Sequence, residues 1–219
     1  MKNSSKSESP SDSFIVSEEI ILPKVSISLI SKIAFSFSKV ISNNELKFYS
    51  HYILDSPFTS NPIPLISIYD YLNRICHYTN ISKETLICAI IYIDNICSTN
   101  KAFLCEFTIH KLLLASIILS IKFNEEQMYS MNYYAEVFGV STKELHNLEL
   151  SFISMINFSL FIKEEKYYQY EQSLINLKID NNLNYIPKNN IKHNEHENNE
   201  EEISLNLSDR NTMSSYDDD

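Results

Sequence analysis

The chain of 219 residues contains a single glycine, Gly139. Glycine adopts positive φ at no steric cost and allows backbone to approach a phosphate closely. Phosphate-binding loops, dinucleotide-binding turns and oxyanion-hole turns need several glycines, so the sequence excludes these classes of site. Tight two-residue β-hairpins also favour glycine in their turns. The near absence of glycine therefore predicts an all-α fold.

Helical patterns follow one another between residues 23 and 179. Pro23 can open the first helix, and Gly139 stands where a left-handed residue would end the fifth. Ser67 and Ser82 can cap the second and third helices, and Thr108 can start the fourth. Ser141 and Glu144 have the spacing of a capping box for the sixth. The expected helices cover residues 23–42, 67–79, 82–98, 108–123, 132–138, 141–155 and 163–179.

Two of these segments are apolar on every side, namely Leu86–Ile93 and Leu112–Ile121. A helix that is apolar all round must be surrounded by other helices. The second run has only ten residues, too few to span a bilayer, so we expect a buried core helix and no membrane partner. The pattern predicts a compact core of five helices with one additional helix at each end.

Charge and composition divide the chain into four parts. We expect a disordered tail over residues 1–20, an N-terminal helix and linker over 21–56, the helical core with its trailing helix over 57–179, and an acidic, Asn-rich disordered tail over 180–219. The last part has 10 acidic and 3 basic residues, whereas the first 179 have 18 and 15. The near-neutral core lacks the basic surface that nucleic-acid binding requires, so we expect no nucleic-acid partner.

The four cysteines, Cys76, Cys88, Cys97 and Cys105, form no CxxC and no zinc-like spacing with histidine. No secretory signal is visible in Met1–Pro10. We therefore expect reduced cysteines in an intracellular protein, cytoplasmic or nuclear, with no metal site. No catalytic triad or paired carboxylates are recognisable, so we expect no catalytic residues and no cofactor.

Three charged residues lie in or beside apolar helical surfaces. Asp94 follows the most apolar helical segment, and Arg74 is the only arginine before the tail, so the two predict a buried structural ion pair. Lys122 ends the second apolar helix, where a lysine can pack its carbon chain on the apolar surface and extend its ammonium to water. Glu149 lies within or beside the apolar stripe of residues 141–155, either as a solvated edge or as a binding contact.

Several motifs in order resemble the cyclin box, and the P-type (PHO-like or plant U-type) cyclins in particular. The similarity covers about residues 57–178. The motifs are Phe58-Thr-Ser-Asn-Pro62, ISIYDYLNRI at 66–75, AIIYIDN at 89–95, IHKLLLASIILSIKF at 109–123 and NYYAEVFGVSTKELHNLEL at 132–150.

The resemblance implies a single five-helix cyclin box with an additional N-terminal and C-terminal helix. It also implies a regulatory subunit that forms a heterodimer with a cyclin-dependent protein kinase and activates it, with the catalytic residues on the kinase. In this family a lysine and a glutamate that match Lys122 and Glu149 face the kinase. Neighbouring apolar contacts match Phe123, Ile153 and Phe158.

The sequence departs from the family in two places. Asn95 replaces the arginine that follows the aspartate of the "YIDR" motif, and no "MRAIL" substrate-docking sequence occurs near residues 66–75. The alternatives are a cyclin-fold scaffold that no longer activates a kinase, or a transcription-associated interaction module. An enzyme is the least supported reading.

Overall fold

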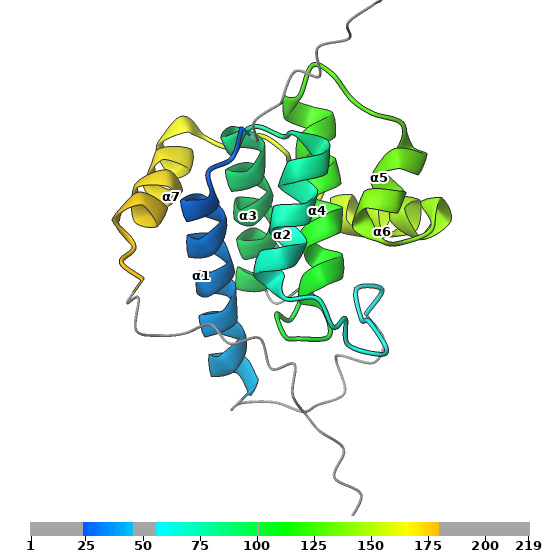
Figure 1. Ribbon diagram of the computed structural model, residues 1–219, viewed down its shortest axis with the longest axis horizontal. Helices are drawn as coiled ribbons and strands as arrows, with labels where there is room; N and C mark the ends of the chain where they lie inside the picture. The colour runs from blue at the N-terminus through cyan, green and yellow to red at the C-terminus, as the bar shows by residue number, and fades with distance from the viewer. Residues whose placement is uncertain (1–23, 46–55, 100, 180–219) are drawn as a thin grey trace, which may run out of the picture. The chain divides into compact units, whose positions relative to one another are not determined.

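A computed structural model describes residues 24–45, 56–99 and 101–179. These residues form helices and connecting loops without a strand, so the predicted all-α fold is confirmed (Figure 1). The tails predicted over 1–20 and 180–219, and most of the linker within 21–56, lie outside the described residues. The helices are α1 (Ile27–Glu45), α2 (Ile68–Thr79), α3 (Lys83–Ser98), α4 (Ile109–Asn124), α5 (Met131–Phe138), α6 (Thr142–Met155) and α7 (Glu164–Asn176).

Serine side chains cap the start of four of the helices that follow α1. Each serine Oγ accepts a hydrogen bond from the backbone N–H three residues later, which satisfies an otherwise unpaired donor of the first turn. Three of these caps are predicted from the sequence, and the cap of α5 is not. The four residues are Ser67, Ser82, Ser130 and Ser141. Gly139, with φ of 76°, ends α5 as expected.

Other helix ends differ from the prediction by a few residues. The first helix begins at Ile27 rather than Pro23, because the Ser26 hydroxyl accepts a hydrogen bond from the Leu29 N–H at 3.2 Å. Thr108 precedes α4 but does not cap it, since its hydroxyl donates to the Phe103 carbonyl at 2.6 Å. Only the serine half of the predicted capping box is formed at α6, because Glu144 pairs with Lys111 at 3.0 Å.

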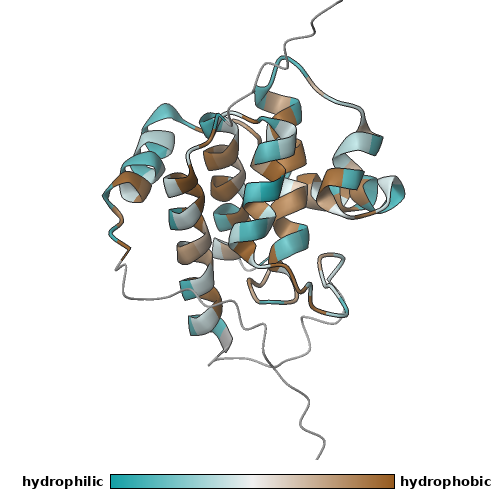
Figure 2. Ribbon diagram, in the orientation of Figure 1, coloured by the Kyte–Doolittle hydropathy of each residue, from teal (hydrophilic) through white to brown (hydrophobic). Residues whose placement is uncertain are grey.

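The two most apolar helices, α3 and α4, pack along each other at the centre of the described fold (Figure 2). Every residue of α4 from Ile109 to Ile121 is buried except Lys111. Helices α1 and α7 contact each other, and α7 also packs on α3. On the other side α6 packs on α4, and α5 joins α2 to α6. The prediction of two central helices is confirmed.

The loop before α2 holds α6 against α4. The Phe58 ring is fully buried and meets the Phe152 ring of α6 edge-on, with centroids 5.9 Å apart. The Lys111 ammonium of α4 donates to the Thr59 carbonyl at 3.0 Å, and the Ser60 N–H donates to the Phe107 carbonyl at 2.8 Å. These contacts fix the relative position of α4 and α6, on which the candidate site depends. Within the described ranges no helix has the length and apolar character needed to cross a bilayer.

Candidate functional site

The C-terminal turn of α4 and the middle of α6 bring two predicted site residues into direct contact. The Lys122 ammonium lies 2.5 Å from Glu149 Oε1. Glu149 is only 8% exposed, whereas the Lys122 side chain is about a third exposed. The reading of Glu149 as a solvated edge is therefore wrong, because α4 covers that edge and supplies Lys122 as the partner of the carboxylate.

The ion pair keeps hydrogen-bonding capacity on its solvent side. An ammonium has three N–H donors, and a carboxylate has two acceptor oxygens. The second oxygen, Glu149 Oε2, lies 3.6 Å from Nδ1 of His146, whose side chain is exposed. The pair can therefore offer both a donor and an acceptor to a partner without leaving either charge uncompensated.

Aromatic side chains lie beside this pair and are open to solvent. Phe123 directly follows Lys122 and is 53% exposed, while Phe158, just beyond α6, is 72% exposed. Ile153, one turn after Glu149 on α6, is half-buried. Exposed apolar and aromatic side chains are typical of protein-binding surfaces rather than of a solvated face.

The backbone that carries Phe158 has an uncommon conformation. Asn157 and Phe158 have φ of 52° and 57°, in the left-handed region. The Phe158 N–H donates to the Ile153 carbonyl at 2.9 Å, which closes the end of α6. A left-handed residue other than glycine costs about 1 kcal/mol or more. The fold thus holds an exposed phenylalanine in a strained position, as functional sites commonly do.

Two further exposed apolar residues escaped the sequence analysis. Leu150 follows Glu149 on α6, and Phe161 follows Phe158 by three residues; both are largely exposed. For Leu150 the sequence did offer a signal, because this apolar residue lies outside the buried stripe of α6, which comprises Leu145, Leu148 and Phe152. Both add exposed apolar area on and just beyond α6.

The predicted buried ion pair between Asp94 and Arg74 is wrong. Asp94 is exposed and accepts a hydrogen bond from the Tyr170 hydroxyl of α7. The Arg74 guanidinium donates instead to the Glu136 carbonyl of α5 at 3.0 Å. The sequence argument assumed that an acid ending an apolar helix is desolvated, but the last turn of α3 opens onto a cleft between α1 and α7.

The described ranges contain no cluster of side chains suited to hold a metal ion. Across residues 24–45, 56–99 and 101–179, no three histidine, cysteine, aspartate or glutamate side chains are grouped to hold a metal. The four cysteines are free. Burial raises the pKa of the Cys76 thiol to about 12, so this group stays protonated at neutral pH.

Comparison with known proteins identifies the family. The cyclin family model matches residues 2–160, about three quarters of the chain. This chain belongs to the cyclin family. The predicted resemblance to P-type and U-type cyclins is confirmed as well, because relatives of these types match at about 30% identity.

Three relatives illustrate the similarity. Cyclin-U2-1 of Arabidopsis thaliana is 30% identical over 145 residues, 65% of each chain. The PHO85 cyclin-like protein psl1 of Schizosaccharomyces pombe is 34% identical over 132 residues, 59% of this chain and 54% of psl1. Cyclin-P3-1 of rice, Oryza sativa subsp. japonica, is 29% identical over 150 residues, 68% of this chain and 62% of its own. This cyclin thus spans about half to two thirds of the length of these three relatives.

Proposed function

We propose that this cyclin is the regulatory subunit of a cyclin-dependent serine/threonine protein kinase, which it binds and activates as a heterodimer. The observation that carries the proposal is the Lys122–Glu149 pair, whose carboxylate is nearly buried and whose ammonium is partly exposed, together with exposed Phe123 and Phe158. The relative psl1 is named as a PHO85 cyclin-like protein, which is in line with a kinase-associated role for this cyclin.

The proposed interface uses five residues with two kinds of contact. Phe123, Ile153 and Phe158 supply apolar area that becomes buried when the kinase binds. Lys122 and Glu149 supply a donor and an acceptor at the centre of that area, where fully desolvated polar contacts act as hot spots. The two charges already neutralise each other within this chain, so they meet the kinase as a pair rather than as two separate charges.

Activation follows from differential affinity. A subunit that binds the active conformation of the kinase more tightly than the inactive one shifts the kinase population toward the active state. A shift from 1% to 99% active needs roughly a 10⁴-fold difference in affinity. The catalytic groups belong to the kinase, and this chain acts by binding alone.

The first test separates stability from binding at the ion pair. Lys122→Met leaves the Glu149 carboxylate nearly buried and unpaired, which costs about 3–5 kcal/mol when both partners are fully buried. Because Lys122 is about a third exposed, we expect a smaller loss of about 2 kcal/mol in the free energy of unfolding. The double variant Lys122→Met/Glu149→Leu removes both charges and should recover most of that stability. Both variants should bind the kinase at least about tenfold more weakly.

A second ion pair between the same helices provides the matched control. Lys111 and Glu144 also join α4 to α6, at 3.0 Å. Lys111→Met should lower stability, because this lysine also bonds the Thr59 carbonyl, yet leave kinase affinity unchanged. The measurements are urea unfolding of the full chain and calorimetric titration of the cyclin-dependent kinase recovered with it from its own cells. Wild-type affinity in the stable double variant would refute the proposed interface, and binding without increased kinase activity would refute activation.

A further inference from the structure

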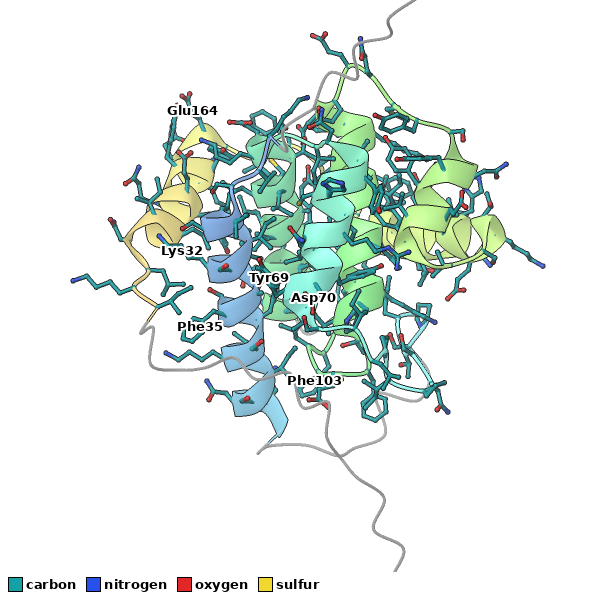
Figure 3. The ribbon with its side chains drawn as sticks, viewed as in Figure 1. Lys32, Phe35, Tyr69, Asp70, Phe103 and Glu164 are labelled. Atoms are coloured by element: carbon teal, nitrogen blue, oxygen red, sulfur yellow. The ribbon has the colours of Figure 1, made fainter. Side chains whose placement is uncertain are left out.

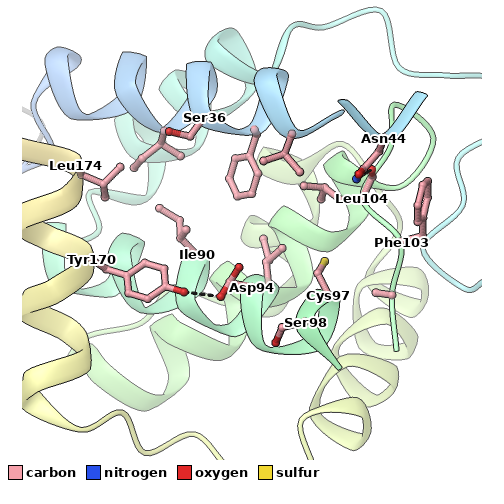
Figure 4. A pocket seen from close by; sticks show the side chains of 15 residues that line it. Ser36, Asn44, Ile90, Asp94, Cys97, Ser98, Phe103, Leu104, Tyr170 and Leu174 are labelled. Atoms are coloured by element: carbon pink, nitrogen blue, oxygen red, sulfur yellow. Dashed lines mark hydrogen bonds between the residues drawn. The ribbon is translucent and has the colours of Figure 1, made fainter. Parts of the chain in front are cut away.

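A cleft of about 440 Å³ lies between α1, α3 and α7 (Figure 4). Its volume falls in the range of about 300–1,000 Å³ that small-molecule sites occupy between packed helices. Helix α7 contacts α1 and α3, while α6 packs on α4, so the cleft and the proposed kinase surface lie on opposite sides of the α3–α4 pair (Figure 1). Its apolar wall includes Ile33, Phe37, Ile90, Ile93, Leu104 and Leu174.

The hydroxyl groups in the wall use their donors within the protein, and the Asn44 amide uses one of its two. Three hydroxyls and one amide donate to neighbouring oxygens, so the groups left facing the cleft are chiefly acceptors. A ligand must therefore bring donors of its own. The bonds run from Ser36 Oγ to the Lys32 carbonyl at 2.9 Å, from Ser98 Oγ to the Asn95 carbonyl at 3.0 Å, from Asn44 Nδ2 to the Leu104 carbonyl at 2.8 Å, and from Tyr170 Oη to Asp94 Oδ2 at 2.5 Å.

Asp94 is the acidic group of this wall, and its side chain lies within the cleft beside Tyr170 (Figure 4). No ion pair with Asp94 occurs in the part of the chain that the structure describes. The cation near Tyr170 is Lys166, which bonds Asn95 Oδ1 and lies 5.9 Å from the centre of the Tyr170 ring. On the α1 side Lys32, which is labelled in Figure 3, donates a hydrogen bond to the Ile175 carbonyl. One oxygen of the Asp94 carboxylate therefore remains available to a ligand.

The raised pKa of the Cys97 thiol argues against covalent chemistry at the cleft. Cys97 is half-buried in the wall. Burial, and then the nearby Asp94 carboxylate, raise the pKa of this thiol to about 12. A protonated thiol is a poor nucleophile, so Cys97 contributes packing. The site is thus equipped for reversible binding.

We propose that the cleft binds a small amphipathic cation, an apolar molecule with one protonated amine. The apolar body lies against α1 and α3, and the ammonium pairs with Asp94 Oδ1. The proposal does not rest on kinase binding. Helix α7, which supplies Tyr170 and Leu174, lies beyond the residues 2–160 that the cyclin family model matches. The site is therefore built partly from a segment outside that match.

The test uses dansylcadaverine, a fluorescent aromatic group linked to a primary ammonium, titrated against the full chain. We expect saturable binding with a blue shift of the dansyl emission. The N-acetylated analogue, which has the same body without the charge, should bind about two- to fivefold more weakly, as expected for an exposed ion pair. Asp94→Asn should abolish this difference and give equal affinities for the two probes. Val40→Trp, at the exposed rim of the cleft, should weaken both probes several-fold.

Glu136→Gln is the control, because it removes an exposed carboxylate on α5 away from the cleft and should leave both affinities unchanged. Three results would overturn the proposal: no binding at millimolar probe, equal affinity of wild type for both probes, or an unchanged preference in Asp94→Asn. Self-association of the chain that displaces the probe would also overturn it, by assigning the cleft to a second copy. Kinase affinity should be the same in Asp94→Asn and wild type, so failure of either proposal is distinguishable.

Discussion

The strained end of α6 allows the role of Phe158 to be tested with a variant that should not destabilise the fold. Phe158→Gly relieves a left-handed conformation that costs about 1–2 kcal/mol with a side chain. Against this, the greater conformational freedom of glycine in the unfolded chain lowers the stability of the fold by about 0.5–1 kcal/mol. Because Phe158 is 72% exposed, loss of its ring forfeits little packing. We expect a net stabilisation of about 0–1 kcal/mol, a rise in melting temperature of up to about 4 °C.

The same change should weaken kinase binding. An exposed aromatic that becomes buried at the centre of an interface contributes about 2 kcal/mol, or roughly thirtyfold in affinity. Asn157→Gly is the matched control, because it relieves the neighbouring left-handed residue and leaves the ring in place. Thermal melts and kinase titrations of both variants give the answer. A loss of more than about 1 kcal/mol in Phe158→Gly would show that the ring supports the fold, and unchanged kinase affinity would remove it from the interface.

Two more predictions concern stability alone. His110 Nε2 lies 2.9 Å from the Ile66 carbonyl, and its Nδ1 is buried without a partner. Burial lowers the pKa of this imidazole in the folded protein, so the unfolded chain takes up a proton more readily. Stability should therefore fall as the pH drops below about 6.5, and urea unfolding at several pH values should show a shallower fall in His110→Leu. Gly139→Ala should lower the melting temperature by about 2–4 °C, because φ of 76° strains alanine while its Cβ would lie at an ordinary 3.6 Å from the Arg74 guanidinium. An unchanged pH dependence or an unchanged melt would contradict the respective reasoning.

Local signals predicted the helices well. Ser67, Ser82 and Ser141 cap their helices because the serine and its bonding partner are three residues apart, within reach of a sequence pattern. Gly139 ends α5 for a similar reason, since only its own conformation is involved. The burial of α3 and α4 follows from composition alone, because a helix without a polar face can lie only inside a protein.

Contacts between distant elements could not be predicted in this way. An apolar stripe indicates that a helix face is covered, but not which helix covers it. Asp94 was assigned to Arg74 because arginine is scarce, whereas a phenol of α7, 76 residues away, is its partner. Glu149 and Lys122 were placed at the same surface by the family resemblance, yet their mutual pairing across 27 residues depends on how α4 and α6 pack.

The arrangement of the helices gives the two proposed surfaces different structural origins. Lys122 and Glu149 depend on α4 and α6, which the loop around Phe58 holds together. Asp94 and Tyr170 depend on α3 and α7. The central α3–α4 contact is built mainly of buried apolar side chains, so it transmits a change only if the core itself has two arrangements. We therefore expect an amine in the cleft to leave kinase affinity unchanged. A kinase titration with and without saturating dansylcadaverine would measure any coupling, and a change in affinity would show that α3 and α4 move together.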